Sequence, residues 1–321
     1  MQSLKNKKVF VTGGAGCIGK ELVNLLLEEG AILFIGDLKP CPEEWKDNKN
    51  ITYREGDLNY IKAERLLDFG PDYVFHLAAK FQRSEETQEF WEENWWHNII
   101  LSHHMIDILK DCSFMKKYIF ASSYLVYNPR LYMTNYTPIG DESKYLDLEE
   151  CYSKNPRNLC GYAKYVHEGE LQYLSKMYNI NYNIARIYRG YGKGSDCVIS
   201  RWIRDILRNK TITTYGVSNY FDFIYSSETA KCLLLLAKSK AENEICNVGN
   251  GRARSIKEVI SILHNNFSEK IKLVEKPVKK EYLYEYSQAN IIKFKNLTNY
   301  TPQLQLENAI PKIIEFERDR L

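Results

Sequence analysis

Short apolar runs alternate with amphipathic stretches along the first part of the chain. The runs KKVFVTG, AILFIGD, PDYVFHLAA and KYIFASS, which begin at residues 7, 31, 71 and 117, have the length and composition of buried strands. Amphipathic helical patterns lie between them, and a further helix at about 160–178 precedes the strand-like run YNIARIY. Alternation of this kind predicts an α/β fold in which a parallel sheet is covered by helices on both faces.

The regular alternation ends after Arg186, where a helical pattern and a strand-like FDFIY are followed by mixed segments. We therefore expect a larger domain at 1–185 and a smaller α/β domain for substrate binding at 186–321. The segment 221–248 is expected to pass back to the larger sheet, so that the two domains are interleaved.

The composition excludes several classes of protein. The 321 residues are 44% hydrophobic and carry 44 basic against 41 acidic side chains, so no overall charge would attract nucleic acid or an anionic membrane. Eight cysteines lie scattered without a CxxC pair, which argues against disulfides and a structural metal site and favours a reducing cytoplasm. The basic N-terminus reaches glycines too soon for a secretory signal, and no segment approaches the length of a membrane span.

The clearest chemical motif is the glycine turn VFVTGGAGCIGK at residues 9–20. Gly13, Gly16 and Gly19 stand between an apolar strand and a helix. Glycine there permits a tight turn, lets the backbone approach a pyrophosphate and lets the helix pack closely on the strand. The turn, with Cys17 and Ile18, would hold a pyrophosphate at the helix N-terminus. The alternative is an ordinary strand-to-helix turn in another kind of α/β protein.

An acidic residue at the end of the next strand favours a bound dinucleotide. Asp37 ends the run LFIGD, 18 residues after Gly19. A carboxylate at this place accepts hydrogen bonds from both ribose hydroxyls and repels a 2′-phosphate, so we predict NAD as the cofactor and a doubly wound Rossmann sheet around it. Lys39 nearby leaves NADP as the alternative.

With this motif in place, the chain resembles the extended short-chain dehydrogenases/reductases that modify nucleotide sugars, over nearly its entire length. The resemblance implies that the acidic-hydrophobic pair in EGDLN contacts the adenine and that the backbone of HLAA lies along the cofactor. The residues concerned are Asp57, Leu58, Leu77, Ala78 and Ala79. Asn94, in the helical segment WEENWWHNII, matches the family's helix asparagine.

The segment YIFASSYLVYN, at 118–128, resembles the family's S-S-x-x-V-Y-G signature. By that resemblance Ser123 is the catalytic hydroxyl that bonds the reacting hydroxyl of the sugar, whereas without it Ser123 would be read as a strand-end cap. Sugar 4,6-dehydratases of the family carry an acid pair directly after this serine, where this chain has Tyr124 and Leu125. Since dehydration needs an acid and a base, we discount that reaction.

The family's active-site helix reads Y-x-x-x-K-x-x-x-E, and CGYAKYVHE places Lys164 and Glu168 on the last two letters. Cys160 then stands where the catalytic tyrosine is expected. In the family, that tyrosine takes the proton of the sugar hydroxyl as hydride leaves for the nicotinamide, and the lysine lowers the tyrosine's pKa and binds the nicotinamide ribose. Lys164, one helical turn from position 160, would keep its catalytic and cofactor-binding place.

Three interpretations of Cys160 stay open. In the first interpretation the thiol is a substitute base, because a neighbouring ammonium would lower its reference pKa of about 8.5. Its sulfur reaches less far from the backbone than the oxygen of a phenol. Alternatively, it is a small buried side chain beside a water relay or another base, for which Tyr124, Tyr162 and His167 are candidates. In the third interpretation it marks a lost activity.

The substrate end also departs from the family. Where many members have an arginine before DF, this chain has Phe221, so one usual contact to the diphosphate is missing. Guanidinium groups suit paired phosphate oxygens, although an arginine is also an ordinary surface charge. The candidate substrate-binding residues are Arg189, Arg201 and Arg204, with Lys279 and Lys280 as weaker ones.

Two of the expected helices carry large apolar side chains at helical spacing. They are Trp91, Trp95, Ile99 and Ile106 on the first, and Val166, Tyr173 and Leu174 on the second. Packing on the sheet uses part of these surfaces. Members of the resembled family pair such helices between subunits in a four-helix bundle, so we expect a homodimer.

The residues and the resemblance together predict an NAD-dependent enzyme that oxidises a nucleotide-diphosphate sugar at C4. Return of the hydride would make it a 4-epimerase, and release of the 4-keto sugar a 4-dehydrogenase. The resemblance indicates sugars of surface polysaccharide synthesis, with a GDP-heptose as the narrowest suggestion. The alternative is a catalytically weakened member that binds NAD(H) as a sensor or partner subunit. Cys160 favours that alternative, and the intact Asp37, Ser123 and Lys164 oppose it.

Overall fold

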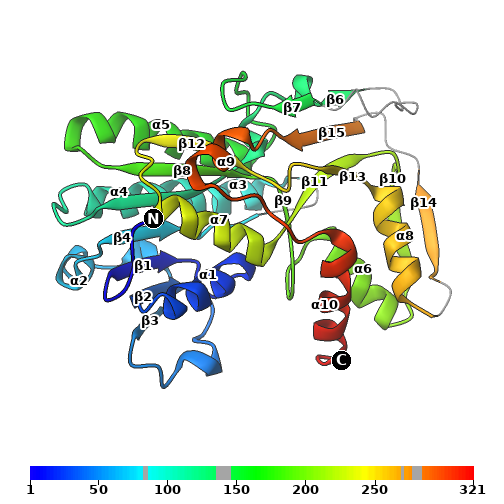
Figure 1. Ribbon diagram of the computed structural model, residues 1–321, viewed down its shortest axis with the longest axis horizontal. Helices are drawn as coiled ribbons and strands as arrows, with labels where there is room; N and C mark the ends of the chain where they lie inside the picture. The colour runs from blue at the N-terminus through cyan, green and yellow to red at the C-terminus, as the bar shows by residue number, and fades with distance from the viewer. Residues whose placement is uncertain (82–85, 135–145, 269–270, 277–283) are drawn as a thin grey trace.

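The computed structural model describes residues 1–81, 86–134, 146–268, 271–276 and 284–321. Lys279 and Lys280 therefore lie outside the described residues. The described chain forms a larger sheet and a smaller one, which lie side by side along the long axis of the molecule with helices around each (Figure 1).

Seven parallel strands form the larger sheet, in the order β12-β8-β5-β4-β1-β2-β3. Their bounds are β1 Lys8–Thr12, β2 Ile32–Asp37, β3 Ile51–Glu55, β4 Tyr73–His76, β5 Lys117–Ser123, β8 Tyr182–Ile187 and β12 Glu244–Val248. From β1 the chain winds outward in both directions, through β2 on one side and β4 on the other. The predicted doubly wound sheet is thus present, and its switch point, where such sheets bind ligands, lies between β1 and β4.

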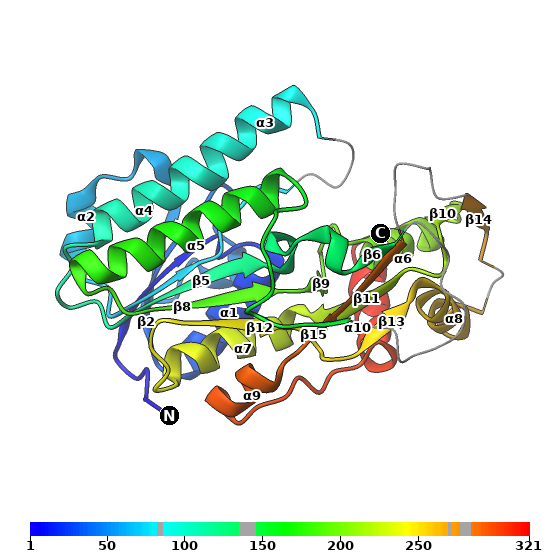
Figure 2. The same cartoon turned by 90° about the horizontal axis from the view of Figure 1, so that it is seen from above.

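Helices cover both faces of this sheet (Figure 2). The helices α1 (Cys17–Glu28) and α7 (Ser226–Lys238) pack together on one face, and α2 (Ala63–Phe69) and α5 (Leu159–Tyr178) lie on the other. A continuous helix joins them there, made of α3 (Gln88–Asn94), the π-helical turn η3 (Trp95–Ile100) and α4 (Leu101–Leu109). Buried side chains such as Leu26 and Met105 stabilise the two layers by ~2 kcal/mol each. Among the described helices, none combines the length and apolar composition needed to cross a bilayer.

The smaller sheet has the order β13-β11-β15-β6, with β9 added to β11 and β7 added to β15. Its bounds are β6 Met133–Thr134, β7 Leu146–Leu148, β9 Arg189–Tyr191, β11 Tyr220–Tyr225, β13 Ala253–Ser255 and β15 Tyr284–Ala289. A separate parallel pair joins β10 (Ile212–Tyr215) to β14 (Leu273–Lys276). Around a second core lie α6 (Val198–Leu207), α8 (Ile256–Asn266) and α10 (Leu306–Arg318), while α9 (Ile292–Thr298) packs near β12. The short helices are η1 Glu43–Trp45, η2 Leu58–Tyr60, η4 Tyr124–Val126 and η5 Pro129–Leu131.

The chain crosses between the two sheets repeatedly. β8 ends in the larger sheet, and β9 enters the smaller one two residues later. Of the segment 221–248, expected to return to the larger sheet, α7 and β12 do so, whereas β11 pairs within the smaller sheet. The division into two domains at 185 and 186 stays a prediction.

Candidate active site

The glycine turn has a backbone that only glycine fits. Gly13 follows β1 with φ of +72°, and a Cβ there would lie 2.7 Å from the backbone nitrogen of Ala78. A Cβ on Gly19 would lie 2.2 Å from the carbonyl oxygen of Gly13. Gly16 is the N-cap of α1 and offers no side chain to the first-turn N–H groups, which suits a pyrophosphate at this end of the helix. Cys17 and Ile18 form the first turn, as predicted for a dinucleotide cradle.

Asp37 lies above this turn at the end of β2. Its two carboxylate oxygens accept hydrogen bonds from the backbone N–H groups of Ala15 and Lys39, each at 2.9 Å. These bonds fix the carboxylate beside the glycine turn, and its remaining lone pairs suit the ribose hydroxyls of an adenosine. The residues of the turn and Asp37 together fit the dinucleotide that the sequence predicts.

The residues predicted near the adenine end are engaged with their surroundings. Asp57 accepts hydrogen bonds from the Trp96 indole at 2.7 Å and from the Asn59 N–H at 2.9 Å. Leu58 is buried against β2, so close that a Cβ on Gly36 would lie 2.5 Å from its side chain. Both residues lie beyond the end of β3, and their contact with adenine stays a prediction.

A buried hydrogen-bond network holds the HLAA segment. The N–H groups of Leu77 and Ala78 donate to Thr12 Oγ1 at 3.2 and 3.1 Å, and Thr12 lies 2.7 Å from His76 Nδ1. Because the threonine oxygen already accepts two bonds, its own hydrogen goes to Nδ1, and Nε2 donates to Ser102 at 2.9 Å. Burial lowers the pKa of His76, in agreement with this neutral tautomer. Leu77, Ala78 and Ala79 are thereby held beside the glycine turn.

Asn98 is a residue that the sequence analysis missed. Its side chain accepts a hydrogen bond from Lys80 N–H at 2.7 Å and donates to the Lys80 carbonyl at 2.9 Å, which fixes the backbone just after Ala79. Asn94, the residue matched to the family's asparagine, accepts a hydrogen bond from the Asn98 side chain at 2.7 Å. Asn98 lies within the π-helical turn η3, which begins directly after Asn94, and no signal in the sequence predicted that turn.

Two adjacent serines end β5 in different surroundings. Ser122 donates to Glu168 at 2.5 Å, and Arg186 binds the same carboxylate with two nitrogens, at 2.7 and 3.0 Å. The buried ion pair between Glu168 and Arg186 stabilises the fold and leaves Ser122 without a role in binding substrate. Ser123 is half-buried, and its oxygen accepts from Leu125 N–H at 3.2 Å, so its hydroxyl hydrogen is not used by that bond. Ser123 therefore suits a contact with substrate.

Helix α5 brings Cys160 and Lys164 to the end of β5. A Cβ on Gly161 would lie 2.5 Å from the carbonyl oxygen of Leu125, so the helix packs tightly on the segment that follows Ser123. Cys160 and Lys164 are 6% and 7% exposed and lie on the same face of the helix, toward the sheet. The Lys164 Nζ is 4.7 Å from the centroid of the Phe120 ring in β5. The predicted catalytic residues thus converge near the switch point of the sheet.

Burial decides the protonation of this pair. It raises the pKa of Cys160, and the opposing effect of Lys164 is smaller. Glu86, whose carboxylate also accepts the Leu159 N–H at 2.8 Å, adds to the increase. Burial likewise lowers the pKa of Lys164. Cys160 is therefore a neutral thiol at physiological pH, which is a poor proton acceptor.

The three suggested substitute bases, Tyr124, Tyr162 and His167, differ in burial and in hydrogen-bond partners. Tyr124 is buried, and its hydroxyl donates to Glu285 at 2.8 Å. Tyr162 is 44% exposed, unlike the buried Cys160 and Lys164. His167 is buried behind Lys164, its Nδ1 lies 2.8 Å from Glu170, and burial lowers its pKa.

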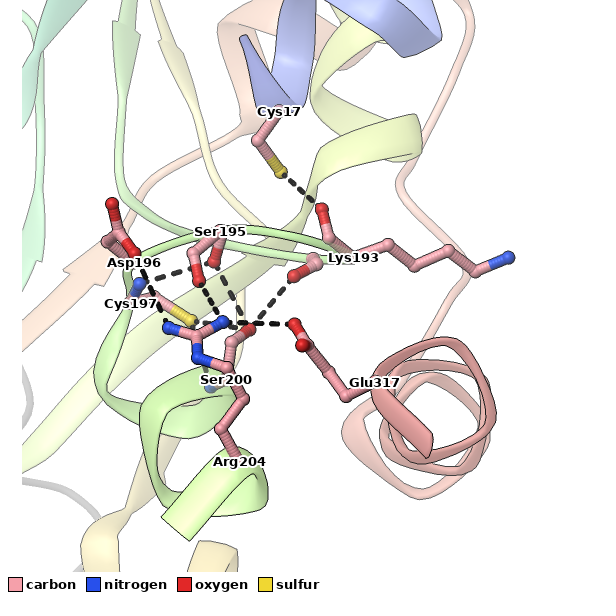
Figure 3. A network of polar contacts seen from close by, with 9 residues as sticks. Cys17, Lys193, Ser195, Asp196, Cys197, Ser200, Arg204 and Glu317 are labelled. Atoms are coloured by element: carbon pink, nitrogen blue, oxygen red, sulfur yellow. Dashed lines mark hydrogen bonds and ion pairs between the residues drawn. The ribbon is translucent and has the colours of Figure 1, made fainter. Parts of the chain in front are cut away.

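The three predicted substrate arginines lie in different places. Arg189, at the start of β9, pairs with Glu285 at 3.1 Å and lies over the Phe221 ring. Arg201 is exposed on α6. Arg204, also on α6, donates to the Ser195 carbonyl at 3.0 Å and pairs with Glu317 of α10 at 3.0 Å (Figure 3).

In Figure 3 the Arg204 side chain also points toward Asp196, at 3.4 Å, and the whole network joins α6 to α10. Cys17 lies at the edge of the same group, with its sulfur 3.5 Å from the Lys193 carbonyl. Arg204 thus forms contacts that hold α6 against α10. Arg189 is the one of the three that closely follows β8 in the sequence. The substrate contacts of all three arginines stay predictions.

Comparisons with known proteins agree with this fold. The sequence profile described as the NAD dependent epimerase/dehydratase family matches residues 9–249. A UDP-glucuronate 4-epimerase from Thermodesulfobacterium geofontis is 25% identical over 97% of this chain and 96% of its own length. A solved UDP-N-acetylglucosamine 4-epimerase from Methanobrevibacter ruminantium, in complex with UDP-N-acetylmuramic acid, is 26% identical with a TM-score of 0.84, covering 99% of this chain and 100% of that one.

A UDP-glucuronic acid 4-epimerase from Bacillus cereus, solved with UDP-glucuronic acid and NAD, has the same fold, with a TM-score of 0.84 at 21% identity over 98% of this chain and 100% of that one. The family profile covers most of the chain, and it confirms the predicted enzyme class, the predicted NAD dependence and the resemblance from which they came. The chain belongs to the NAD dependent epimerase/dehydratase family, and its relatives include nucleotide-sugar epimerases and decarboxylases.

Proposed function

We propose that this enzyme oxidises C4 of a UDP-linked sugar and returns the hydride to the opposite face, as a 4-epimerase. The observation that carries the proposal is the convergence of Ser123 and Lys164 near the switch point of the sheet, in a chain whose relatives include named 4-epimerases of UDP sugars. The names of these relatives favour uridine as the base. The GDP-heptose suggested from the sequence stays a prediction.

NAD, when bound, supplies the acceptor for the C4 hydride. Ser123 would orient the C4 hydroxyl through its free hydroxyl hydrogen. Because burial keeps Cys160 neutral, we assign the proton not to the thiol but to Lys164, whose pKa is lowered by burial. A water molecule between O4 and Lys164, in the volume that a phenol would occupy, would carry the proton.

A panel of UDP-glucose, UDP-glucuronate and UDP-N-acetylglucosamine tests this proposal. Product NMR and the absorbance of NADH are followed together on the purified enzyme. We expect the 4-epimer without net NADH. One equivalent of NADH with a 4-keto sugar would instead identify a 4-dehydrogenase.

The sensor or partner subunit remains the second candidate, and Cys160 is the observation that favours it. Heat on titration of NAD⁺ into the stripped protein, combined with no turnover of any sugar in the panel, would support this candidate against the enzyme.

We further propose a homodimer formed through α3, η3, α4 and α5. Trp91, Trp95 and Tyr173 are 50%, 48% and 64% exposed, which is unusual for such large apolar side chains. The tryptophans border a surface hollow of about 580 Å³. Ile106, in contrast, is fully buried in the packing on the sheet. The remaining exposed surface resembles the apolar part of an interface.

The proposed compartment is the cytoplasm, where nucleotide-sugar chemistry of polysaccharide synthesis would place it. All eight cysteines are free thiols, which suits a reducing environment.

A further inference from the structure

A buried cluster of charges lies beside the candidate active site and has no part in the chemistry proposed above. Its centre is Glu285 of β15, which is 1% exposed. Glu285 forms ion pairs with Arg157 and with Arg189, the latter at 3.1 Å. It also accepts hydrogen bonds from the Tyr124 hydroxyl at 2.8 Å and from Ser287 at 2.7 Å. The carboxylate is therefore bound by groups from three other segments of the chain and by Ser287 of its own strand.

The backbone places this cluster at the sugar end of the site. Tyr124 directly follows Ser123, and Arg157 lies three residues before Cys160. The Arg157 N–H donates to the carbonyl of Leu125 at 3.0 Å, which ties the two segments together. The cluster thus adjoins the residues that would meet O4, and it lies away from the glycine turn.

Arg189 reaches the same carboxylate from β9. Its guanidinium lies 3.8 Å from the centroid of the Phe221 ring. Phe221 is the residue that stands where many family members have an arginine. Stacking on this ring and pairing with Glu285 hold the guanidinium plane in one orientation.

The cluster has unused capacity for an anion. Two guanidinium groups face a single carboxylate, so one positive charge is left over. The side chains of Arg157 and Arg189 are 27% and 34% exposed, so part of each can be reached from solvent. Among the described residues, the buried Nε of Arg189 has no hydrogen-bond partner, so Glu285 does not use the whole guanidinium group.

The geometry of a hexopyranose indicates which anion suits this place. C1 and C4 lie opposite each other in the ring, so with O4 at Ser123 the diphosphate on O1 points away from Tyr124. C6 is attached to C5, the neighbour of C4, and stays on the near side. Building on the proposed function, we infer that Arg157 and Arg189, oriented by Glu285, bind the C6 carboxylate of a nucleotide-linked uronic acid and select it over the neutral hexose.

Glu285 acts in this subsite as a positioning residue. Burial alone would raise its pKa, but Arg157 and Arg189 outweigh burial and lower the pKa to about 2. The carboxylate therefore stays ionised at neutral pH. It holds both guanidinium groups in place, and their remaining N–H groups match the two oxygens of a second carboxylate.

Binding of substrate analogues tests the inference without requiring turnover. The full chain loaded with NAD⁺ is titrated with UDP-glucuronate, UDP-glucose and UDP in a calorimeter. We expect the wild type to bind UDP-glucuronate about 10-fold or more tightly than UDP-glucose, the range for a charge-assisted hydrogen bond. In Arg189→Gln the affinity for UDP-glucuronate should fall ~10- to 100-fold, while the affinities for UDP-glucose and UDP change less than about 3-fold.

The matched control is Arg208→Gln, an exposed arginine at the end of α6, which should leave all three affinities unchanged. Glu285→Gln should reduce the preference for the uronate, and Glu285→Asp should restore part of it. Where Glu285→Gln does not fold, the wild-type ratio and Arg189→Gln still decide the question.

Two results would overturn the inference. Equal wild-type affinities for UDP-glucuronate and UDP-glucose would show that the site does not select the uronate. An Arg189→Gln variant that weakens all three ligands alike would assign the arginine to the shared diphosphate. Turnover is a separate readout: a protein that prefers the uronate but converts no sugar would contradict the proposed function and leave the subsite intact.

Discussion

Cys160 stands where the catalytic tyrosine of the family is expected, and its thiol has an unsuitable proton affinity for a base. The thiol lies on the face of α5 that meets the sheet, where burial raises its pKa in spite of the nearby Lys164. The same burial lowers the pKa of Lys164. Proton transfer at this site is therefore expected to depend on the amine and not on the sulfur.

Substitution at position 160 checks this assignment. Cys160→Ala should keep the turnover number within about 3-fold of wild type, because a neutral thiol contributes no base. Cys160→Tyr should raise turnover by ~10-fold or more, because a phenol beside Lys164 supplies general base catalysis. Steady-state conversion of the best UDP sugar is the measurement.

The control for this series is Cys112→Ala, which removes another buried thiol at a distance from the site. A loss of more than about 100-fold in Cys160→Ala, with the control unaffected, would show that the thiol takes the proton after all.

The choice between NAD and NADP is expected to depend on one residue, Asp37. Asp37→Asn removes the negative charge and keeps an acceptor oxygen for one of the two backbone N–H groups that Asp37 binds. The ratio of NAD⁺ to NADP⁺ affinity should fall ~10-fold or more, since a 2′-phosphate is no longer repelled. Calorimetry with both coenzymes measures this ratio. Asp68→Asn, an exposed aspartate of α2, is the control, and an unchanged ratio in Asp37→Asn would refute the role of Asp37.

At the scale of elements, the helix that runs from α3 to α4 has two functions. Its π-helical turn carries Asn98, which fixes the backbone after Ala79 beside the cofactor cradle. Its outer side carries Trp91 and Trp95, which are about half exposed. One helix thus contributes both to the site and to the proposed interface with a second copy.

Charge placed on this surface tests the homodimer. The double variant Trp95→Glu and Tyr173→Glu should be monomeric at micromolar concentration, because a dimer would have to bury unpaired carboxylates. Light scattering coupled to gel filtration gives the mass. Tyr215→Glu, on the exposed side of β10, should remain a dimer. A monomeric wild type, or a double variant that still dimerises, would contradict the proposal.

The sequence predicted the elements whose signals are local. The glycine turn, Asp37, Ser123 and Lys164 each follow from a strand end or a helical spacing, and the structure brings them to one edge of the sheet. Asn98 was missed because a π-helical turn changes the helical register between it and Asn94.

Residues that meet from distant parts of the chain were harder to predict. Arg204 looked like a phosphate ligand, but its partner Glu317 lies 113 positions later. Glu285 was not considered, because its arginines lie 128 and 96 positions away and no short motif contains them. The pairing of β15 with β11 is visible in the folded topology and has no local signal in the sequence.

For the whole molecule, Glu285 links the two sheets. Arg157 precedes α5 on the larger sheet, whereas Arg189 and Glu285 belong to β9 and β15 of the smaller one. Breaking a buried pair by removing one partner leaves uncompensated charge, so the stability of the assembled molecule depends on this carboxylate.

Glu285→Gln should lower the free energy of unfolding by ~3 kcal/mol at pH 7. The folded pKa of about 2 lies below the unfolded value of about 4.3, so the stabilisation is present above about 4.3 and is lost as the pH falls toward 2. Urea unfolding at pH 7, 5 and 3 should show the gap between wild type and variant narrowing at the lowest pH.

A matched control is Glu44→Gln, which breaks a surface ion pair with Lys20 and should change stability by less than about 1 kcal/mol at every pH. A gap for Glu285→Gln that stays the same from pH 7 to 3 would mean that the ionised carboxylate is not its source.

The position of β15 in the chain also orders events during synthesis. Every strand of the larger sheet has been synthesised once β12 is complete, but the smaller sheet must wait for residues 284–289 to complete its centre. Until then Arg157 and Arg189 lack their ion pairs with Glu285, and the carboxylate-binding subsite proposed above is incomplete. A growing chain would therefore be able to hold its coenzyme before it can recognise a sugar.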